Sequence, residues 1–157
     1  MTPPGAAELV FITSPEQRAA AYAIRFDVFV TEQQVPAELE LDDRDAEAEH
    51  VLALVDGEPQ ATGRLVVEPA GFEGVDPAAG PVAHLGRIAV RAAARGQGLG
   101  MAVMQALEVR ARERGLHVAY LTGQLYAVPF YERLGYTPWG DEVEDAGIMH
   151  RHMSRPL

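Results

Sequence analysis

The 157-residue sequence contains no cysteine and has few positive charges. Without cysteine there can be no disulfide, no thiolate metal site and no covalent intermediate on a cysteine. The 13 basic residues face 23 acidic ones, so the formal net charge is -10 at pH 7. Sequence-independent binding of a nucleic-acid backbone needs a basic surface, which this composition does not provide. We therefore expect neutral or cationic partners and no nucleic acid.

Long hydrophobic runs are also absent. The first residues, MTPPGAAELVFITSPEQ, turn polar after Ile12 and do not follow the pattern of a signal peptide. No segment approaches the roughly 18 apolar residues of a membrane span. We therefore expect a cytoplasmic protein without membrane contact. Its length and its 48% hydrophobic content are typical of one packed domain, which we expect to cover residues 1–157.

The first half of the chain contains signals for a strand, a helix and a hairpin. Residues 8–12 are rich in strand formers, and Ser14 followed by Pro15 is typical of a helix start. Apolar residues spaced by three and four extend this helix to about residue 31. An acidic segment, 32–49, is expected to be loop-like or briefly helical. Two strands, 50–55 and 60–68, flank an Asp-Gly turn.

The second half alternates strands and helices. Residues 69–81 are rich in glycine and proline and are expected to form a flexible connection to a strand at 82–90. A helix over 98–114 is indicated by an apolar stripe that ends at Gly115. A strand at 117–123, a short helix closed by Gly135 and a final strand at 148–153 follow. The order β-α-(loop)-β-β-β-α-β-α-β predicts an α/β fold with a mixed sheet.

Three glycines, Gly96, Gly98 and Gly100, precede the long helix. A glycine-rich turn between a strand and a helix exposes amide groups that suit a phosphate, although the same glycines could simply form a tight turn. The dinucleotide fingerprint fails, because its third small residue would fall at Met101 or Val103. A mononucleotide loop requires a Gly-Lys-Ser/Thr ending, which is missing. NAD and ATP are therefore disfavoured.

Two motifs together resemble the GCN5-related N-acetyltransferase (GNAT) family. The first is Arg-x-x-Gly-x-Gly, which begins at Arg95 between a strand and an amphipathic helix. The second is a pattern that this family writes Asn-x-x-Ala-x-x-x-Tyr-x-x-x-Gly-Phe. Its spacing is matched here by Gln124, Ala127, Tyr131, Gly135 and Tyr136. The stretches VFVTEQQVP and PFYERLGY are similar to the ElaA/YjcF-like branch of small bacterial acetyltransferases.

The resemblance implies a GNAT fold, which has a central mixed, mostly antiparallel sheet flanked by helices, and acetyl-CoA as co-substrate without a metal. Loop amides would grip the pyrophosphate and strand backbone would pair with the pantetheine. The implied cofactor-binding residues are Ile88, Ala89, Val90, Arg95, Gly96, Gln97, Gly98, Leu99, Gly100 and Gln124. Gln124 replaces the asparagine of the family, so its contact with the pantetheine arm is left open.

Acetyl transfer needs a proton donor for the leaving thiolate and an acceptor for the proton of the amine. Tyr131 is the candidate donor, since a phenol stays protonated at neutral pH. Local spacing alone equally suits a core tyrosine, and the family pattern favours the catalytic role. His84 is the candidate base, because imidazole titrates near neutrality and some family members carry a catalytic glutamate on this strand. An ordinary strand histidine is the alternative, and Glu32, Glu49 and His50 are other candidates.

The acceptor side is less defined by the sequence. The segment ELELDDRDAEAE, from Glu38 to Glu49, could attract a cationic amine or be a solvated acidic loop. A second resemblance, to acyl-homoserine-lactone synthases, rests on Arg25, Phe29, Asp42, Asp45, Arg64 and Arg87. The candidate substrate-binding residues are Arg25, Phe29, Asp42 and Arg87 from these observations, together with Glu32, which is also one of the alternative bases.

The function implied by the resemblance is transfer of an acetyl group from acetyl-CoA to a primary amine, by direct attack in a ternary complex. Two alternatives are an acyltransferase like the homoserine-lactone synthases and a CoA-binding sensor module without turnover. His150 and His152 alternate on the last strand, but nothing near them supplies further metal ligands, so no metal is expected. A homodimer is left open.

Overall fold

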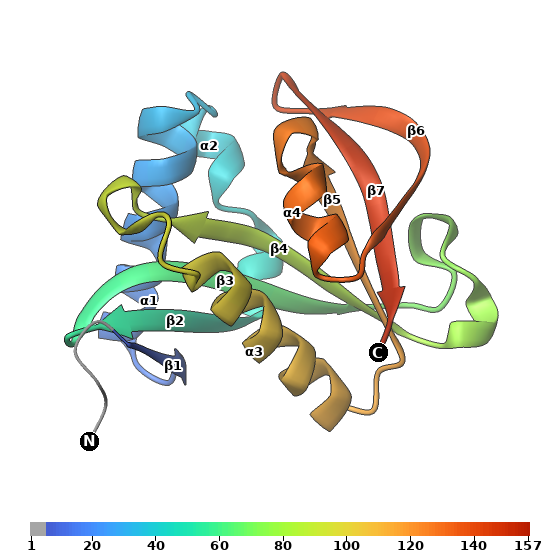
Figure 1. Cartoon of the computed structure of the whole chain (residues 1–157), viewed down its shortest axis with the longest axis horizontal. Helices are drawn as coiled ribbons and strands as arrows, with labels where there is room; N and C mark the ends of the chain where they lie inside the picture. Colours follow the sequence, from blue (N-terminus) through green and yellow to red (C-terminus); the bar gives the residue numbers. More distant parts are fainter. Residues whose placement is uncertain (1–5) are drawn as a thin grey trace. The chain divides into compact units, whose positions relative to one another are not determined.

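The computed structural model describes residues 6–157, which build one seven-stranded sheet in the order β1-β2-β3-β4-β5-β7-β6 (Figure 1). The strands are β1 (Ala7–Phe11), β2 (Glu49–Val55), β3 (Glu58–Glu68), β4 (Val82–Val90), β5 (Val118–Gln124), β6 (Thr137–Asp145) and β7 (Ile148–Pro156). The helices are α1 (Pro15–Arg25), α2 (Ala37–Glu40), α3 (Leu99–Glu113) and α4 (Val128–Arg133). β4 and β5 pair in parallel, whereas the β1–β2, β2–β3, β5–β7 and β6–β7 pairs are antiparallel. The predicted mixed, mostly antiparallel α/β fold is confirmed.

One strand escaped prediction. β6 brings the strand number to seven, so the sequence-based order with six strands is wrong. Its sequence, TPWGDEVED, holds a proline, a glycine and four acidic residues, all of which are weak strand formers. Pairing with β7 holds it in place, with a register shift between Trp139 and Glu142. The final strand also extends to Pro156, beyond the predicted end at residue 153.

The described residues group into two compact units. The first consists of the chain up to Leu65 together with Arg87–Leu107, and the second of Val66–Gly86 together with Glu108–Leu157. β3, β4 and α3 contribute residues to both units. A single domain over the whole chain stays a prediction, and each unit is described below by itself.

The first unit begins with the predicted cap. The Ser14 side chain accepts a hydrogen bond from the Gln17 amide, as expected for an N-cap. The helix expected over 14–31 is α-helical only to Arg25 and continues as a π-helix over Phe26–Glu32. The Gln33 amide donates to the Val28 carbonyl five residues earlier, at 3.1 Å. Apolar spacing alone cannot distinguish this wider turn from an α-helix, and such turns are frequent at functional sites.

The β2–β3 hairpin and the helix α3 that packs against it agree with the elements predicted from the sequence. Asp56 and Gly57 both have positive φ, 51° and 81°, as a two-residue hairpin turn requires. On β3, a side chain at Gly63 would place its Cβ 2.7 Å from both Ile88 and Val103. Glycine at this position therefore lets α3 lie directly against the strand. The predicted apolar stripe of α3 is buried, from Leu99 at 3% exposure to Ala111 at 0%.

The second unit contains the helix ends and the last strands. α3 ends as predicted: Gly115 has a φ of 74° and its amide donates to Arg112, while the Leu116 amide donates to Ala111. Gly135 closes α4 in the same way. The connection over 69–81 was expected to be flexible, but it contains two 3₁₀ turns, Phe72–Gly74 and Pro77–Ala79.

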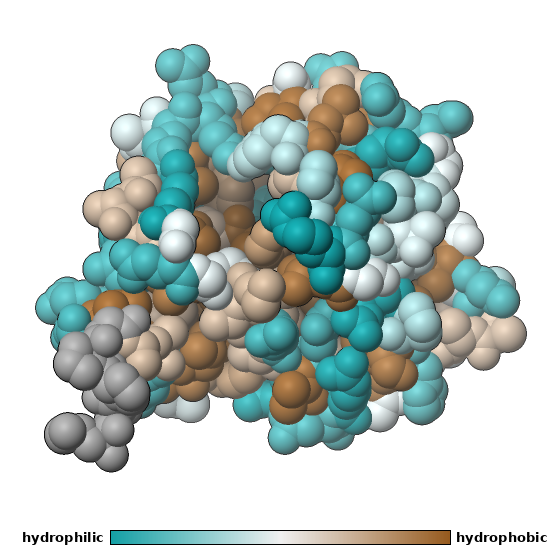
Figure 2. All heavy atoms as spheres, in the orientation of Figure 1, coloured by the Kyte–Doolittle hydropathy of each residue, from teal (hydrophilic) through white to brown (hydrophobic). Residues whose placement is uncertain are grey.

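The surface mixes polar and apolar side chains. On the face shown in Figure 2, brown apolar atoms are interspersed with teal polar ones. Within residues 6–157, no helix has both the length and the apolar character that crossing a membrane requires.

Candidate functional site

The glycine loop lies at the start of α3 in the first unit. Gly96 and Gly98 have φ values of 81° and 79°, a conformation that side chains other than glycine rarely adopt. Nothing lies within 4 Å of the position where either glycine would carry a Cβ. The Gly98 carbonyl accepts the Ala102 amide at 3.1 Å, which makes Gly98 the last residue before the helix. The loop thus combines open space with the amides of a helix N-terminus, which attract anions.

Strand β4 leads into this loop. Ala89 is buried at 2% exposure, whereas Ile88 and Val90 are partly exposed. Arg87 has a φ of 52°, an uncommon value for a residue with a side chain and one that distorts the strand locally. The predicted cofactor-binding residues of β4 and of the loop, 88–90 and 95–100, therefore belong to one unit and follow one another along the chain.

Two ion pairs connect the loop to the π-helix within the first unit. Arg95 Nη2 lies 2.8 Å from Glu32 Oε1, and Arg91 contacts Asp27. Arg95 also donates to the Val90 carbonyl at 3.1 Å. Glu32 was predicted on the acceptor side, and the structure pairs it with the arginine predicted for the cofactor. Both side chains are about two-fifths exposed, so solvent screens their attraction.

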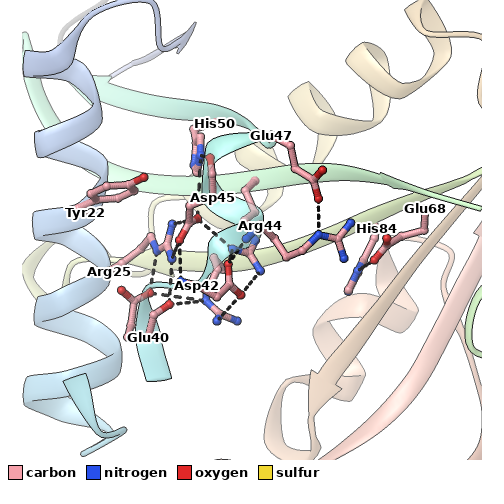
Figure 3. A network of polar contacts seen from close by, with 12 residues as sticks. Tyr22, Arg25, Glu40, Asp42, Arg44, Asp45, Glu47, His50, Glu68 and His84 are labelled. Atoms are coloured by element: carbon pink, nitrogen blue, oxygen red, sulfur yellow. Dashed lines mark hydrogen bonds and ion pairs between the residues drawn. The ribbon is translucent and has the colours of Figure 1, made fainter. Parts of the chain in front are cut away.

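A buried ion network dominates the rest of the first unit (Figure 3). Arg25, at the end of α1, makes four hydrogen bonds: one to the Glu40 carboxylate, one to the Glu40 carbonyl and two to the Asp45 carboxylate. Arg64 on β3 bonds Asp45 and bonds both Asp42 oxygens at 2.7 and 2.9 Å. Arg87 reaches the Glu40 carbonyl and Asp42. Three arginines thus face three carboxylates, and their formal charges cancel.

The network shifts the titration of its members. Burial alone would raise the pKa of Asp45, but hydrogen bonds and attraction from Arg25 outweigh it and hold this pKa well below its ordinary value. The hydrogen bond from Arg64 likewise lowers the pKa of Asp42. Burial lowers the pKa of His50, whose Nε2 lies 3.0 Å from the Asp45 carbonyl. His50 is therefore neutral near pH 7.

The network separates the predicted acceptor residues by exposure. Arg25 is 1% exposed, and its donors point to Glu40 and Asp45. This geometry supports a role in holding residues 37–46, not the direct acceptor contact predicted for it. Phe29 packs against the apolar cluster around Ile24 and Val28. Asp42 and Arg87 keep 31% and 25% exposure, so for them direct contact with an acceptor stays a prediction.

A hollow of about 480 Å³ lies beside this network in the first unit. It is lined by Arg18, Tyr22, Leu41, Asp42, Asp45 and Ala46. Arg18 donates to the Tyr22 hydroxyl at 3.0 Å and to the Asp45 carbonyl at 3.3 Å. Part of the acidic segment therefore forms a structured wall of a hollow, where the sequence left a solvated loop as the alternative.

Tyr131, the candidate proton donor, lies on α4 in the second unit. Its ring packs on β5 at Gly123, where an added Cβ would lie 3.0 Å from the ring. Phe130 and Tyr136 contact the ring edge to face, with centroids 5.1 and 6.2 Å away. Burial raises the pKa of Tyr131 above its ordinary value, so the hydroxyl keeps its proton across the neutral range. Gln124 is the last residue of β5, opposite His150 on β7.

His84, the candidate base, is partly exposed on β4 in the second unit. Its Nδ1 lies 2.9 Å from Glu68 Oε2, and Glu68 is 3% exposed (Figure 3). Phe72 and Tyr120 contact the ring, and Tyr120 in turn bonds His152 Nδ1 at 2.6 Å. Sequence reasoning missed Glu68, because its partner lies 16 residues further along the chain. The only sequence signal is an acidic residue directly after the short apolar run of residues 65–67 at the end of the strand.

The mixed sheet and the glycine loop before α3 agree with the fold expected of an acyl-CoA N-acyltransferase. A family model described as "Acetyltransferase (GNAT) family" matches residues 17–136. The chain therefore belongs to the GNAT family of acetyltransferases. Members of this family use an acyl-CoA and an acceptor substrate.

Individual relatives agree with this assignment. The uncharacterized N-acetyltransferase YjcF of Bacillus subtilis is 35% identical over 147 residues, which cover 93% of this chain and 97% of YjcF. An acyl-CoA N-acyltransferase from Pseudomonas aeruginosa has 29% identity and a TM-score of 0.78, over 96% of this chain and 99% of its own. Escherichia coli ElaA has 26% identity and a TM-score of 0.76, over the same shares of the two chains.

Proposed function

We propose that the protein transfers an acetyl group from acetyl-CoA to a primary amine by direct attack in a ternary complex. The observation that carries this proposal is the loop at Gly96 and Gly98, where positive φ and open space at both Cβ positions coincide before α3. A pyrophosphate needs close approach to backbone amides, and side chains at these positions would fill that space.

The residues present fit acetyl-CoA. The amides at the start of α3 would bind the pyrophosphate, and Arg91 and Arg95 lie within the same unit with partly exposed guanidinium groups. The backbone of Ile88 and Val90 would pair with the pantetheine arm. When bound, acetyl-CoA supplies an activated acetyl thioester whose carbonyl carbon the amine nitrogen attacks, so that a C–N bond forms and the C–S bond breaks.

Two side chains of the second unit would handle the protons. Tyr131 holds its proton at neutral pH and would deliver it to the leaving sulfur, which yields the free thiol of CoA. His84 would accept the proton lost by the amine, directly or through a water. No nucleophile of the protein takes part, in keeping with the absence of cysteine.

The acceptor is proposed to be a primary amine that can be cationic. Asp42 and Glu32 offer partly exposed carboxylates on the first unit, and the net charge of -10 favours approach of a cation. Asp42 already faces Arg64 and Arg87, so its attraction for a further cation is reduced.

The structure gives the homoserine-lactone-synthase alternative little support. Five of the six residues behind that resemblance, Arg25, Asp42, Asp45, Arg64 and Arg87, bind one another in the ion network. Their donors and acceptors therefore stabilise the fold of the first unit. A CoA-binding module without turnover would not need Tyr131 against Gly123, and replacing this tyrosine separates the two possibilities.

Tyr131→Phe should lower kcat about 100-fold while leaving the acetyl-CoA dissociation constant within twofold of wild type, because the variant keeps the ring and loses only the hydroxyl group that donates the proton. Thiol release from acetyl-CoA would be followed with spermidine, kanamycin and a lysine-containing peptide as acceptors. The protein contains no lysine, so acetylation of its own side chains at lysine cannot contribute to the thiol release that is measured. Tyr126→Phe is the matched control, since Tyr126 is 78% exposed, and it should leave kcat unchanged. Equal losses of affinity and rate in Tyr131→Phe would instead show a structural tyrosine.

A further inference from the structure

The contact between Glu68 and His84 is unequal in exposure. Glu68 Oε2 and His84 Nδ1 are 2.9 Å apart, within hydrogen-bond distance. The Glu68 side chain is 3% exposed, whereas that of His84 is 29% exposed. A buried carboxylate is costly unless it accepts hydrogen bonds, so this contact stabilises Glu68. It also holds the more exposed partner of the pair, the His84 imidazole, in position.

Aromatic rings restrict the same imidazole further. The Phe72 ring lies 5.2 Å from the His84 ring between centroids, tilted by 41°. The Tyr120 ring lies 5.3 Å away at 60°. With Nδ1 held by Glu68 and the ring contacted by two aromatic neighbours, rotation about the side-chain bonds is limited. The orientation of His84 is thus set before any acceptor arrives, which favours proton transfer.

The partner of Nδ1 determines which nitrogen can act as base. An ionised carboxylate only accepts hydrogen bonds, so Nδ1 must carry a hydrogen to donate to Glu68. In the neutral imidazole the lone pair then resides on Nε2. We propose that Glu68 is a positioning residue that holds His84 in this tautomer, so that Nε2 takes the proton of the acceptor amine. This inference rests on the proposed function, in which His84 is the base.

The proton balance of the step is complete. As the amine nitrogen forms its bond to the acetyl carbon, its N–H proton passes to His84 Nε2. The ring then carries a positive charge, which the Glu68 carboxylate stabilises while Nδ1–H remains bound to it. Release of the Nε2 proton to water restores the neutral ring, and the Tyr131 phenolate takes up a proton from water to replace the one given to the leaving sulfur. Glu68 stays ionised throughout and does not itself bind the acceptor.

A second histidine in the same unit provides an internal reference. The Tyr120 hydroxyl lies 2.6 Å from His152 Nδ1, a distance that fits an O–H donor better than an N–H donor. Burial raises the pKa of Tyr120, so this hydroxyl has its proton available to donate. His152 is therefore expected in the opposite tautomer, with its hydrogen on Nε2. The two histidines should differ in one nitrogen NMR spectrum.

The experiment is ¹⁵N NMR of the histidine rings in the full chain at about pH 8, with His84 assigned from the spectrum of His84→Gln. In wild type, His84 should show a protonated Nδ1 and His152 a protonated Nε2. In Glu68→Gln, His84 should shift towards the Nε2–H form while His152 is unchanged. In the same variant kcat should fall roughly 10- to 100-fold, while KM for acetyl-CoA stays within twofold.

Glu73→Gln is the matched control, because it removes an exposed carboxylate from the turn that carries Phe72 and should alter neither tautomer nor kcat. An Nε2–H tautomer of His84 in wild type would overturn the proposal without any variant. A kcat loss in Glu68→Gln no larger than in Glu73→Gln would also overturn it. Thiol release by wild type with spermidine, kanamycin or the peptide tests the proposed function separately, so the two failures are distinguishable.

Discussion

The ion network of the first unit and the Glu68–His84 pair of the second both bury carboxylates, but they leave different groups accessible. In the network, Arg25 is 1% exposed and its partners Glu40 and Asp45 are 3% and 6% exposed. In the second unit Glu68 is equally buried, yet its partner His84 is 29% exposed. The contacts of Arg25 with Glu40 and Asp45 satisfy the charges of these three residues internally, whereas the Glu68–His84 pair leaves a titratable ring partly exposed.

This difference in exposure distinguishes residues that stabilise the fold from residues that can take part in proton transfer. When both partners of an ion pair are buried, neither has a hydrogen-bonding group left for a substrate. Removing one partner then lowers the free energy of unfolding. A partly exposed ring that is held by a buried carboxylate can exchange a proton with a ligand. By this criterion Arg25 and Asp45 stabilise the fold, and His84 remains the candidate for proton transfer.

The largest effect is expected at Arg25. Arg25→Ala leaves the Asp45 and Glu40 carboxylates buried with fewer partners, and should lower the free energy of unfolding by about 3–5 kcal/mol. Urea unfolding followed by circular dichroism measures this. Glu32→Gln breaks the exposed pair with Arg95 and, as control, should cost less than about 1 kcal/mol. Similar losses in both variants would remove the distinction between a buried network and a surface pair.

A smaller effect on the free energy of unfolding is expected when the pH is lowered. The folded-state pKa of Asp45 lies below its ordinary value of 3.8, so its contribution to stability is complete at about pH 5 and above, and is lost progressively as the pH falls through 3.8 towards the folded-state pKa. Urea unfolding should show declining stability from about pH 5 to pH 3. Asp45→Asn should be less stable at pH 7 and show a shallower decline. An equally steep decline in both proteins would assign the acid sensitivity to other carboxylates.

Much of the fold could be predicted because its signals are local. The Ser14 cap, the Asp56–Gly57 turn and the glycine that ends α3 each depend on residues within one turn of chain. The π-helix and β6 could not be predicted. The apolar residues of the π-helix fall at spacings that also fit an α-helix, and β6 depends on pairing with β7.

The candidate site likewise has parts that could be predicted from local motifs and parts that depend on the fold. The glycine loop and the Tyr131 pattern are contiguous motifs, and the sequence therefore located both. Glu68 and the ion network depend on residues 15 to 47 positions apart that the fold brings together. The sequence singled out Arg25, but its near-complete burial is a property of the folded chain.

Calorimetric titration with acetyl-CoA tests the central claim most directly. Wild type should bind acetyl-CoA and give no response to S-adenosylmethionine, whereas Gly98→Val should lose acetyl-CoA binding. Gly57→Val is the matched control, because Gly57 also has open space and a φ of 81° but lies in the β2–β3 turn. Both replacements strain the backbone by about 1–2 kcal/mol, and only Gly98→Val should affect binding. Normal acetyl-CoA binding by Gly98→Val, or a response of wild type to S-adenosylmethionine alone, would contradict the account.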